Sequence, residues 1–154
     1  MTMKKIVYGL LLLILGSHEN SWAAGSQPEV QQLAIDSAVL GEKRDLVVYL
    51  PAGYQNSRDR YPVLYLTDGD IQGPHTAGTI DYLAKFEQMP PMIVVGMVNP
   101  PETRTRDLTV TPSDKQNPNQ LENADRFLAF VENEVIPFVK QQYRTLDYQL
   151  LSGT

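Results

Sequence analysis

The chain has 154 residues, of which 42% are hydrophobic and 20% charged, which is enough apolar material for one modest globular domain. Its 13 basic and 18 acidic residues give a formal net charge of -5, which argues against the basic surface that nucleic-acid binding requires. Because the chain contains no cysteine, disulfide frameworks and cysteine-ligated metal sites are excluded.

The N-terminal segment of the chain has the form of a secretory signal peptide. Lys4 and Lys5 precede an apolar stretch over residues 6–15, and small side chains follow at Ser21 and Ala23. The apolar stretch is shorter than the ~20 residues that span a bilayer, so an uncleaved membrane anchor is the lesser alternative. We therefore expect an exported protein, periplasmic or secreted, from which this segment is removed.

The first elements predicted after this segment form a β-hairpin. Residues 30–39 mix apolar and polar positions ahead of a turn at Gly41, and residues 46–50 are a β-rich run that ends at Pro51. Two such runs joined by a short turn predict an antiparallel pair of strands.

Three later segments have the composition of buried strands, namely residues 62–66, 92–98 and 148–151. Central strands of parallel sheets are covered on both faces and therefore read as nearly continuous apolar runs. Between the first two, apolar residues recur at helical spacing in residues 75–88, which predicts a helix.

The region between the last two strands divides into a loop and a helix. Residues 99–120 are rich in proline and polar residues and predict a long loop of the kind that often carries function. A helix is then expected, capped by Asn123 or Asp125, with Pro137 either kinking it or starting its last stretch. One face of this helix is apolar, formed by Phe127, Phe130, Val131, Val135 and Phe138.

This order of elements predicts an α/β fold with a mostly parallel sheet and an N-terminal antiparallel hairpin. In open α/β sheets, functional groups lie where the parallel strands end. Three such ends are present, at residues 68–71, from Asn99 onward, and at residues 152–154.

The last of these strand ends has the form of an approach to a nucleophile elbow, G-x-S-x-G, in which a sharp strand-to-helix turn presents a serine. Gly153 would be its first glycine and Thr154 the next position, which places the serine directly beyond Thr154. An ordinary strand end is the simpler alternative. Ser152 lies within the strand, where its hydroxyl cannot be presented, and is not a candidate nucleophile.

Several segments together carry a resemblance to a known family: residues 61–70, 104–109, 127–145 and 150–153. In order and spacing they resemble the Putative esterase family of α/β-hydrolases, similar to enterobactin esterase and, more distantly, to the mycolyltransferase antigen 85 proteins. The likeness covers nearly all of residues 24–154 but only the N-terminal half of the family's domain. It departs at Val110, where relatives usually carry proline, and at the C-terminus, where the family continues into Ser-x-Gly-Gly.

The resemblance implies hydrolysis of carboxylic esters by a triad of serine, aspartate or glutamate, and histidine. In this fold the three follow in that chain order, so all of them are expected beyond Thr154. We therefore expect residues 24–154 to be the N-terminal portion of an α/β-hydrolase domain, truncated before the nucleophile, without catalytic residues of its own and inactive as it stands.

The resemblance also implies two roles within the chain. The backbone N–H of Asp70, with Gly69 allowing close approach, is expected to supply half of an oxyanion hole, although a simple Asp-Gly turn is an alternative. Arg104 and Arg106 are candidates for binding an anionic group of the substrate. Equally, Arg106 could pair with Asp107 or Glu102 and order the loop.

Two other candidate sites fail on position. His75 precedes the elbow and opens a predicted helix, so it is not assigned as a general base. Asp68, Asp70 and Gly73 match part of a calcium-binding loop, but Thr79 stands where that loop requires a bidentate glutamate. We expect no metal and no cofactor.

A second function class stays open on the sequence alone, a non-catalytic binding or interaction module. In that interpretation the half-domain folds alone or dimerises through the open edge of residues 148–151, and Arg104 and Arg106 recognise an anionic ligand. For the full-length family the expected partner is a small-molecule ester. No nucleic acid is expected, and membrane contact is expected only through the signal peptide.

Overall fold

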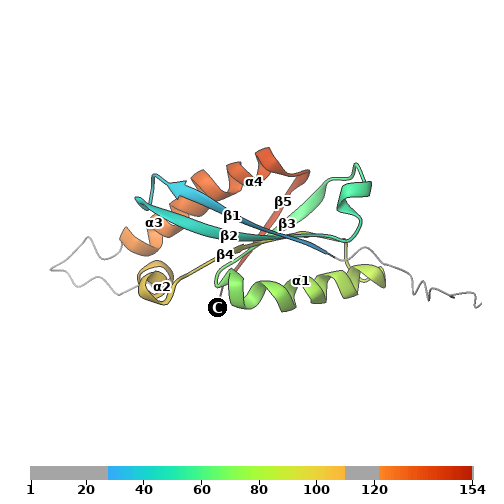
Figure 1. Cartoon of the computed structure of the whole chain (residues 1–154), viewed down its shortest axis with the longest axis horizontal. Helices are drawn as coiled ribbons and strands as arrows, with labels where there is room; N and C mark the ends of the chain where they lie inside the picture. The colour runs from blue at the N-terminus through green and yellow to red at the C-terminus, as the bar shows by residue number, and fades with distance from the viewer. Residues whose placement is uncertain (1–27, 110–121, 154) are drawn as a thin grey trace, which may run out of the picture.

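The computed structural model describes residues 28–109 and 122–153. The predicted signal peptide and the departure at Val110 lie outside these residues. A five-stranded sheet lies between helices on its two faces (Figure 1). The elements in chain order are β1 (Glu29–Ser37), β2 (Glu42–Leu50), the short 3-10 helix η1 (Tyr54–Asn56), β3 (Tyr61–Leu66), α1 (Gly69–Lys85), β4 (Ile93–Met97), α2 (Pro101–Leu108), α3 (Glu122–Phe130), the π-helical turn η3 (Val131–Val135), α4 (Ile136–Gln142) and β5 (Thr145–Ser152).

The predicted N-terminal hairpin is confirmed. β1 and β2 pair antiparallel in continuous register from Glu29 opposite Leu50 to Ser37 opposite Glu42. Gly41 closes the turn at a φ of 72°, a left-handed conformation that glycine adopts without steric penalty. β2 then joins the hairpin to the rest of the sheet by pairing antiparallel with β4.

The remaining strands form the parallel part of the sheet, as predicted. The strand order is β1-β2-β4-β3-β5, and β3 lies parallel to both β4 and β5. Because β3, β4 and β5 run in the same direction, their carboxyl ends lie at one edge of the sheet.

Each face of the sheet is covered by its own apolar cluster. On one face, side chains such as Val63, Ile93 and Val95 pack against the helical segment from α3 to α4. On the other face, Leu66 and Val94 pack against Ala77 and Ile80 of α1. Figure 1 shows α1 in green on one side of the sheet and α3 and α4 in orange on the other.

The first predicted helix is present, but it begins at Gly69 and not at residue 75. Its early buried positions are Gly69 and Gly73, followed by Ala77 and Ile80. Glycines occupy the buried stripe in the first two turns because the backbone packs closely there, so no apolar side chain signals those turns in the sequence.

The predicted long loop over residues 99–120 is wrong in its first part, where residues 101–108 form α2. Pro101 lies in the first turn, where a backbone N–H would have no acceptor within the helix, so proline costs no hydrogen bond there. The only fully buried residue of α2 is Asp107, and only Leu108 of this helix packs on the apolar core. Polar contacts therefore contribute much of its anchoring, and it has no apolar stripe to reveal it. Residues 110–121 lie outside the described chain.

The second predicted helix is confirmed as one helical run with a π-helical turn in its middle. The expected cap is wrong, because α3 begins at Glu122 and both Asn123 and Asp125 lie within it. Pro137 lies in the first turn of α4, so it starts the last stretch, one of the two expected outcomes. Phe130, Val135 and Val139 are buried against the sheet.

The final predicted strand is also confirmed, but the prediction that it is buried is wrong. Leu150 and Leu151 pair in parallel with Leu64 and Tyr65 of β3, yet they are 40% and 54% exposed. β5 is an edge strand with one neighbour among the described residues, so its apolar side chains lack the cover that a central strand receives. Within the described part of the chain, no helix is long and apolar enough to span a membrane.

Candidate active site

The carboxyl ends of β3, β4 and β5 meet at one edge of the sheet, beside the beginning of α1 (Figure 1). The N–H of Thr67 donates to the carbonyl of Ser152 over 3.2 Å. A Cβ on Gly153 would lie 3.3 Å from the Thr67 hydroxyl oxygen. The end of β5 is therefore in contact with the turn that follows β3, as the sequence predicts.

Asp68 forms the turn between β3 and α1 in an unusual backbone conformation. It is buried and has a φ of 50° and a ψ of 44°, in the left-handed region. Its N–H donates to Oδ1 of Asn99 over 2.9 Å, and its carbonyl accepts from the N–H groups of Ile71 and Gln72. These bonds tie the turn to the end of β4 and to the first turn of α1.

Arg104 of α2 binds the Asp68 carboxylate through two parallel hydrogen bonds. Nε lies 2.8 Å from Oδ1 and a terminal nitrogen lies 2.9 Å from Oδ2. The Asp68 side chain is 6% exposed and that of Arg104 is 44% exposed. The hydrogen bonds to Asp68 raise the pKa of Arg104 further, which keeps the guanidinium charged.

Gly69 and Asp70 are the first two residues of α1, and Gly69 packs directly on β4. A Cβ at Gly69 would lie 2.2 Å from backbone atoms of Gly96, so neither residue of this pair tolerates a side chain. The first N–H groups of an α-helix have no intrahelical acceptor. The N–H groups of Gly69 and Asp70 thus lie at the carboxyl edge of the sheet, where such donors can stabilise a developing negative charge.

A cleft of about 430 Å³ opens beside the Asp70 side chain. Asp45 and Asp70 contribute its carboxylates, and Val47 and Val98 contribute apolar lining. Burial, and then the nearby Asp70 carboxylate, raises the pKa of Tyr49. This cleft has room for a small ligand next to the first turn of α1.

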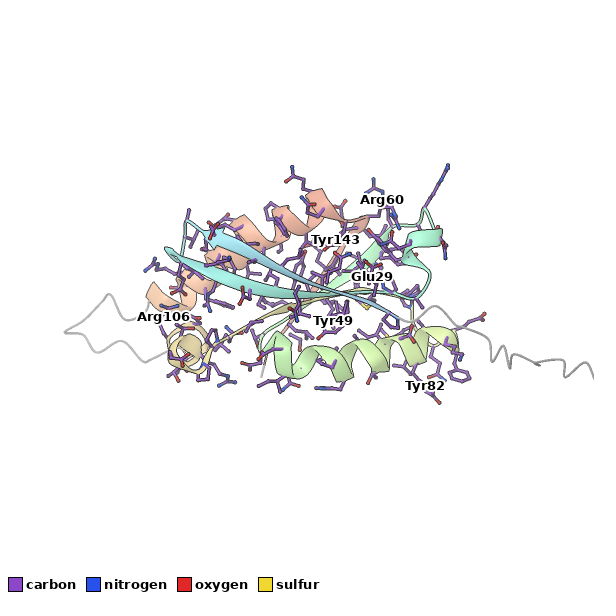
Figure 2. All side chains as sticks on the ribbon, viewed as in Figure 1. Glu29, Tyr49, Arg60, Tyr82, Arg106 and Tyr143 are labelled. Carbon is purple, nitrogen blue, oxygen red and sulfur yellow. The ribbon has the colours of Figure 1, made fainter. Side chains whose placement is uncertain are left out.

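Arg106 occupies a different environment from Arg104, although both lie on α2. Figure 2 labels Arg106 beside this helix. Its guanidinium pairs with Glu42 of β2 and with Asp107, whose carboxylate also pairs with the buried Arg44. The hydrogen bonds from Arg106 hold the pKa of the Glu42 carboxyl below its usual range. The pairing of Arg106 with Asp107, one of the expected alternatives, is present, and substrate contact by either arginine stays a prediction.

Two participants at this edge were not identified from the sequence. The sequence gives Asn99 only as a strand end, and it gives Asp68 only as the first residue of the expected oxyanion-hole turn and as a rejected calcium ligand, with no role for its side chain. An asparagine directly after a buried strand is a usable signal, because the carboxyl end of that strand lies beside the turn after β3. The pairing of Asp68 with Arg104 has no such signal, since the two are 36 residues apart.

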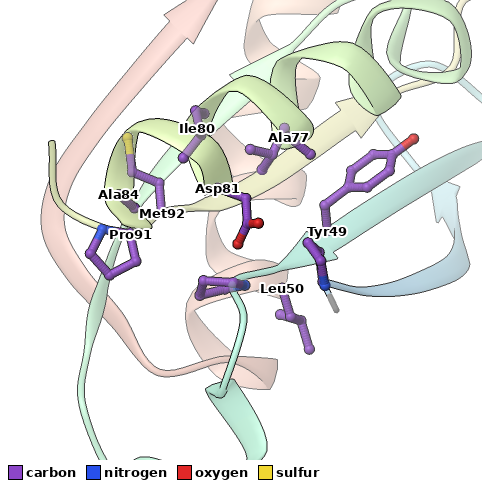
Figure 3. A pocket seen from close by; sticks show the side chains of 11 residues that line it. Tyr49, Leu50, Ala77, Ile80, Asp81, Ala84, Pro91 and Met92 are labelled. Atoms are coloured by element: carbon purple, nitrogen blue, oxygen red, sulfur yellow. The ribbon is translucent and has the colours of Figure 1, made fainter. Parts of the chain in front are cut away.

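A second, apolar pocket lies away from this edge (Figure 3). Tyr49, Leu50, Ala77 and Ile80 line it together with Asp81, and its volume is about 20 Å³, close to that of one water molecule. It is too small for an ester substrate. Among the described residues, no group of three or more candidate ligands could hold a metal ion.

The sheet order, the parallel strand ends and the turn after β3 define an α/β-hydrolase-like fold. The family model described as Putative esterase matches residues 37–154, and the chain belongs to this family. It is a family of hydrolases of the esterase class. No curated protein matches the chain.

Solved structures share this fold. An IroE-like serine hydrolase from Shewanella oneidensis is 37% identical with a TM-score of 0.68, and the match covers 80% of this chain and 42% of that one. A siderophore hydrolase from Aspergillus nidulans is 23% identical with a TM-score of 0.66, covering 83% and 50%. The enterobactin esterase of Shigella flexneri, solved in the presence of enterobactin, is 18% identical with a TM-score of 0.61, covering 82% and 30%. The chain thus spans half or less of the length of each of these proteins.

Proposed function

We propose that these residues form the N-terminal portion of an exported carboxylic ester hydrolase in which the turn at Asp68 to Asp70 supplies one half of the oxyanion hole. The nucleophilic serine, its acidic and histidine partners and the second half of the hole lie beyond Thr154 in this proposal. The substrate is a small-molecule ester, and the 154-residue polypeptide by itself does not hydrolyse it.

One observation carries the proposal. The N–H groups at the start of α1 lie at the same sheet edge as the end of β5, which contacts Thr67 through Ser152 and Gly153. A serine presented just after β5 would therefore attack a carbonyl whose oxygen is within reach of these donors. Loss of a triad costs several powers of ten in rate, so the scaffold alone retains negligible activity.

The proposal is tested by assaying two products with p-nitrophenyl acetate and a serine-directed inhibitor. The 154-residue polypeptide is expected to show no inhibitor-sensitive hydrolysis. A longer product, translated from the nucleotide sequence after codon 154, is expected to contain Ser-x-Gly, a later acid and a later histidine, and to be active. Ser152→Ala in that product serves as the control and should keep the activity, because this hydroxyl lies on β5.

Inhibitor-sensitive hydrolysis by the 154-residue polypeptide would contradict the proposed division of the site. A longer product that contains the triad and hydrolyses no ester would contradict the function itself.

Export is the second part of the proposal. It is supported by Lys4 and Lys5 ahead of the apolar stretch and by the small residues Ser21 and Ala23. The mature protein is expected in the periplasm or the medium with Ala24 as its first residue, which intact-mass measurement would establish. A protein that keeps its first 23 residues there would contradict cleavage.

Self-association of the 154-residue polypeptide is the third part. Among the described residues β5 has no strand on its outer side, and it exposes Tyr148, Leu150 and Leu151 at the edge of the sheet, a combination that favours pairing with another copy. We expect oligomers in analytical ultracentrifugation, and we expect Leu151→Lys to shift the distribution toward monomer. Leu128→Lys, which introduces the same charge at an exposed leucine of α3, is the matched control. A monomeric wild-type polypeptide would contradict association.

A further inference from the structure

We propose that Arg104 and Asn99 are positioning residues that hold Asp68 in its left-handed conformation and so aim the N–H groups of Gly69 and Asp70 at the substrate oxyanion. The inference deepens the proposed function and rests on it. Neither residue touches the substrate in this role, since both act through Asp68.

The conformation of Asp68 is the first support. A residue with a side chain has its φ in the left-handed region only at an energetic cost, which surrounding contacts must offset. Here every polar group of Asp68 is hydrogen-bonded. Its N–H donates to Asn99, its carbonyl accepts from the first turn of α1, and its carboxylate accepts from Arg104. Gly69 directly follows, so the backbone angles of Asp68 set the direction of the next two N–H groups.

Charge balance is the second support. The Asp68 carboxylate is buried one residue before the donors that would stabilise negative charge on the substrate. An unpaired carboxylate at that point would oppose the developing oxyanion. The bidentate contact with Arg104 neutralises it, and two parallel hydrogen bonds also restrict its orientation.

The buried side chain of Asn99 is the third support. Its Oδ1 accepts from Asp68, and within the described residues its Nδ2 has no hydrogen-bond partner. The Thr67 hydroxyl, on the residue before Asp68, is likewise buried and unmatched in the described chain. Buried polar groups are ordinarily paired, so these two groups indicate that a polar group at this sheet edge completes the site around Asp68.

A structural measurement tests the inference without relying on catalysis. In the ¹⁵N-labelled 154-residue chain, Arg104→Met is expected to shift the amide resonances of Gly69 and Asp70. It is also expected to speed hydrogen exchange at least about tenfold at Asp68, Ile71 and Gln72, whose N–H groups bond Asn99 or the Asp68 carbonyl. Adding Asp68→Asn removes the uncompensated charge and keeps a residue that tolerates the left-handed region, so both signals should move back toward wild type. Arg60→Met is the control, because Arg60 binds a backbone carbonyl at the opposite end of β3.

A kinetic measurement in the longer, active product tests the consequence for the reaction. Arg104→Met is expected to lower kcat by about 10- to 100-fold with KM changed by less than about threefold, because the donors act on the transition state. The second substitution, Asp68→Asn, should restore at least about fivefold in kcat, whereas Arg60→Met should leave kcat within about twofold.

Each outcome bears on the inference. Unchanged Gly69 and Asp70 amides in Arg104→Met would overturn it, as would a loss confined to KM, which would instead indicate substrate binding by Arg104. Unfolding of Arg104→Met that Asp68→Asn does not reverse would overturn the charge-balance role. If the wild-type longer product hydrolyses no ester, the proposed function fails, while the amide measurement still decides whether Arg104 holds the turn.

Discussion

Asp107→Ala is expected to destabilise the folded chain by about 3–5 kcal/mol, the range found when one partner of a buried ion pair is removed. The side chains of Asp107 and Arg44 are 1% and 4% exposed, and Arg106 binds the same carboxylate. Among the described residues, removing the carboxylate leaves the buried Arg44 guanidinium with Glu42 as its one carboxylate partner, besides a bond to the Thr103 hydroxyl. Chemical denaturation followed by circular dichroism would measure the change.

The control for this prediction is Asp147→Ala. Asp147 is fully exposed and pairs with Lys140 at 3.4 Å, so its removal should leave the denaturation midpoint unchanged. The double variant Arg44→Met with Asp107→Leu should recover much of the lost stability, because an apolar pair of similar volume carries no desolvation penalty. A midpoint for Asp107→Ala equal to that of wild type would show that α2 is not anchored through this carboxylate.

Gly69→Ala is expected to destabilise the chain by about 3 kcal/mol, the upper end of the usual cost of overpacking. The added Cβ would lie 2.2 Å from two backbone atoms of Gly96 and 2.6 Å from the Met97 nitrogen. Backbone atoms cannot move aside as a flexible side chain can, so α1 must shift away from β4. The same shift would displace the N–H groups at the start of the helix.

Gly78→Ala on the same helix is the matched control. A Cβ at Gly78 meets nothing within 4 Å, and alanine favours a helix interior over glycine by about 0.5–1 kcal/mol. In thermal unfolding, Gly69→Ala should therefore lower the Tm and Gly78→Ala should raise it. A Gly69→Ala protein as stable as wild type would contradict the close approach of α1 to β4.

The strands were predictable because their signals are local. Residues 62–66 and 92–98 are nearly continuous apolar runs, and the structure places β3 and β4 there with both faces covered. The helix containing Phe130 and Val135 was predictable for the same reason, since its buried side chains recur at helical spacing.

The elements that were missed are held by contacts that leave no apolar pattern. The first turns of α1 pack through Gly69 and Gly73, where the absence of a side chain is what allows the contact. α2 is anchored by two ion pairs to distant parts of the chain. Asp107 pairs with Arg44, and Arg104 pairs with Asp68. The exposure of Leu151 likewise depends on the position of β5 in the sheet and not on its composition.

By itself, the sequence determined the α/β class, the order of the strands along the chain and the family resemblance, because hydrophobic periodicity and motif spacing are properties of neighbouring residues. Only the tertiary structure decided that Asp68 adopts a left-handed conformation between Asn99 and Arg104. That conformation depends on residues more than 30 positions apart, which the parallel pairing of β3 and β4 brings to one edge.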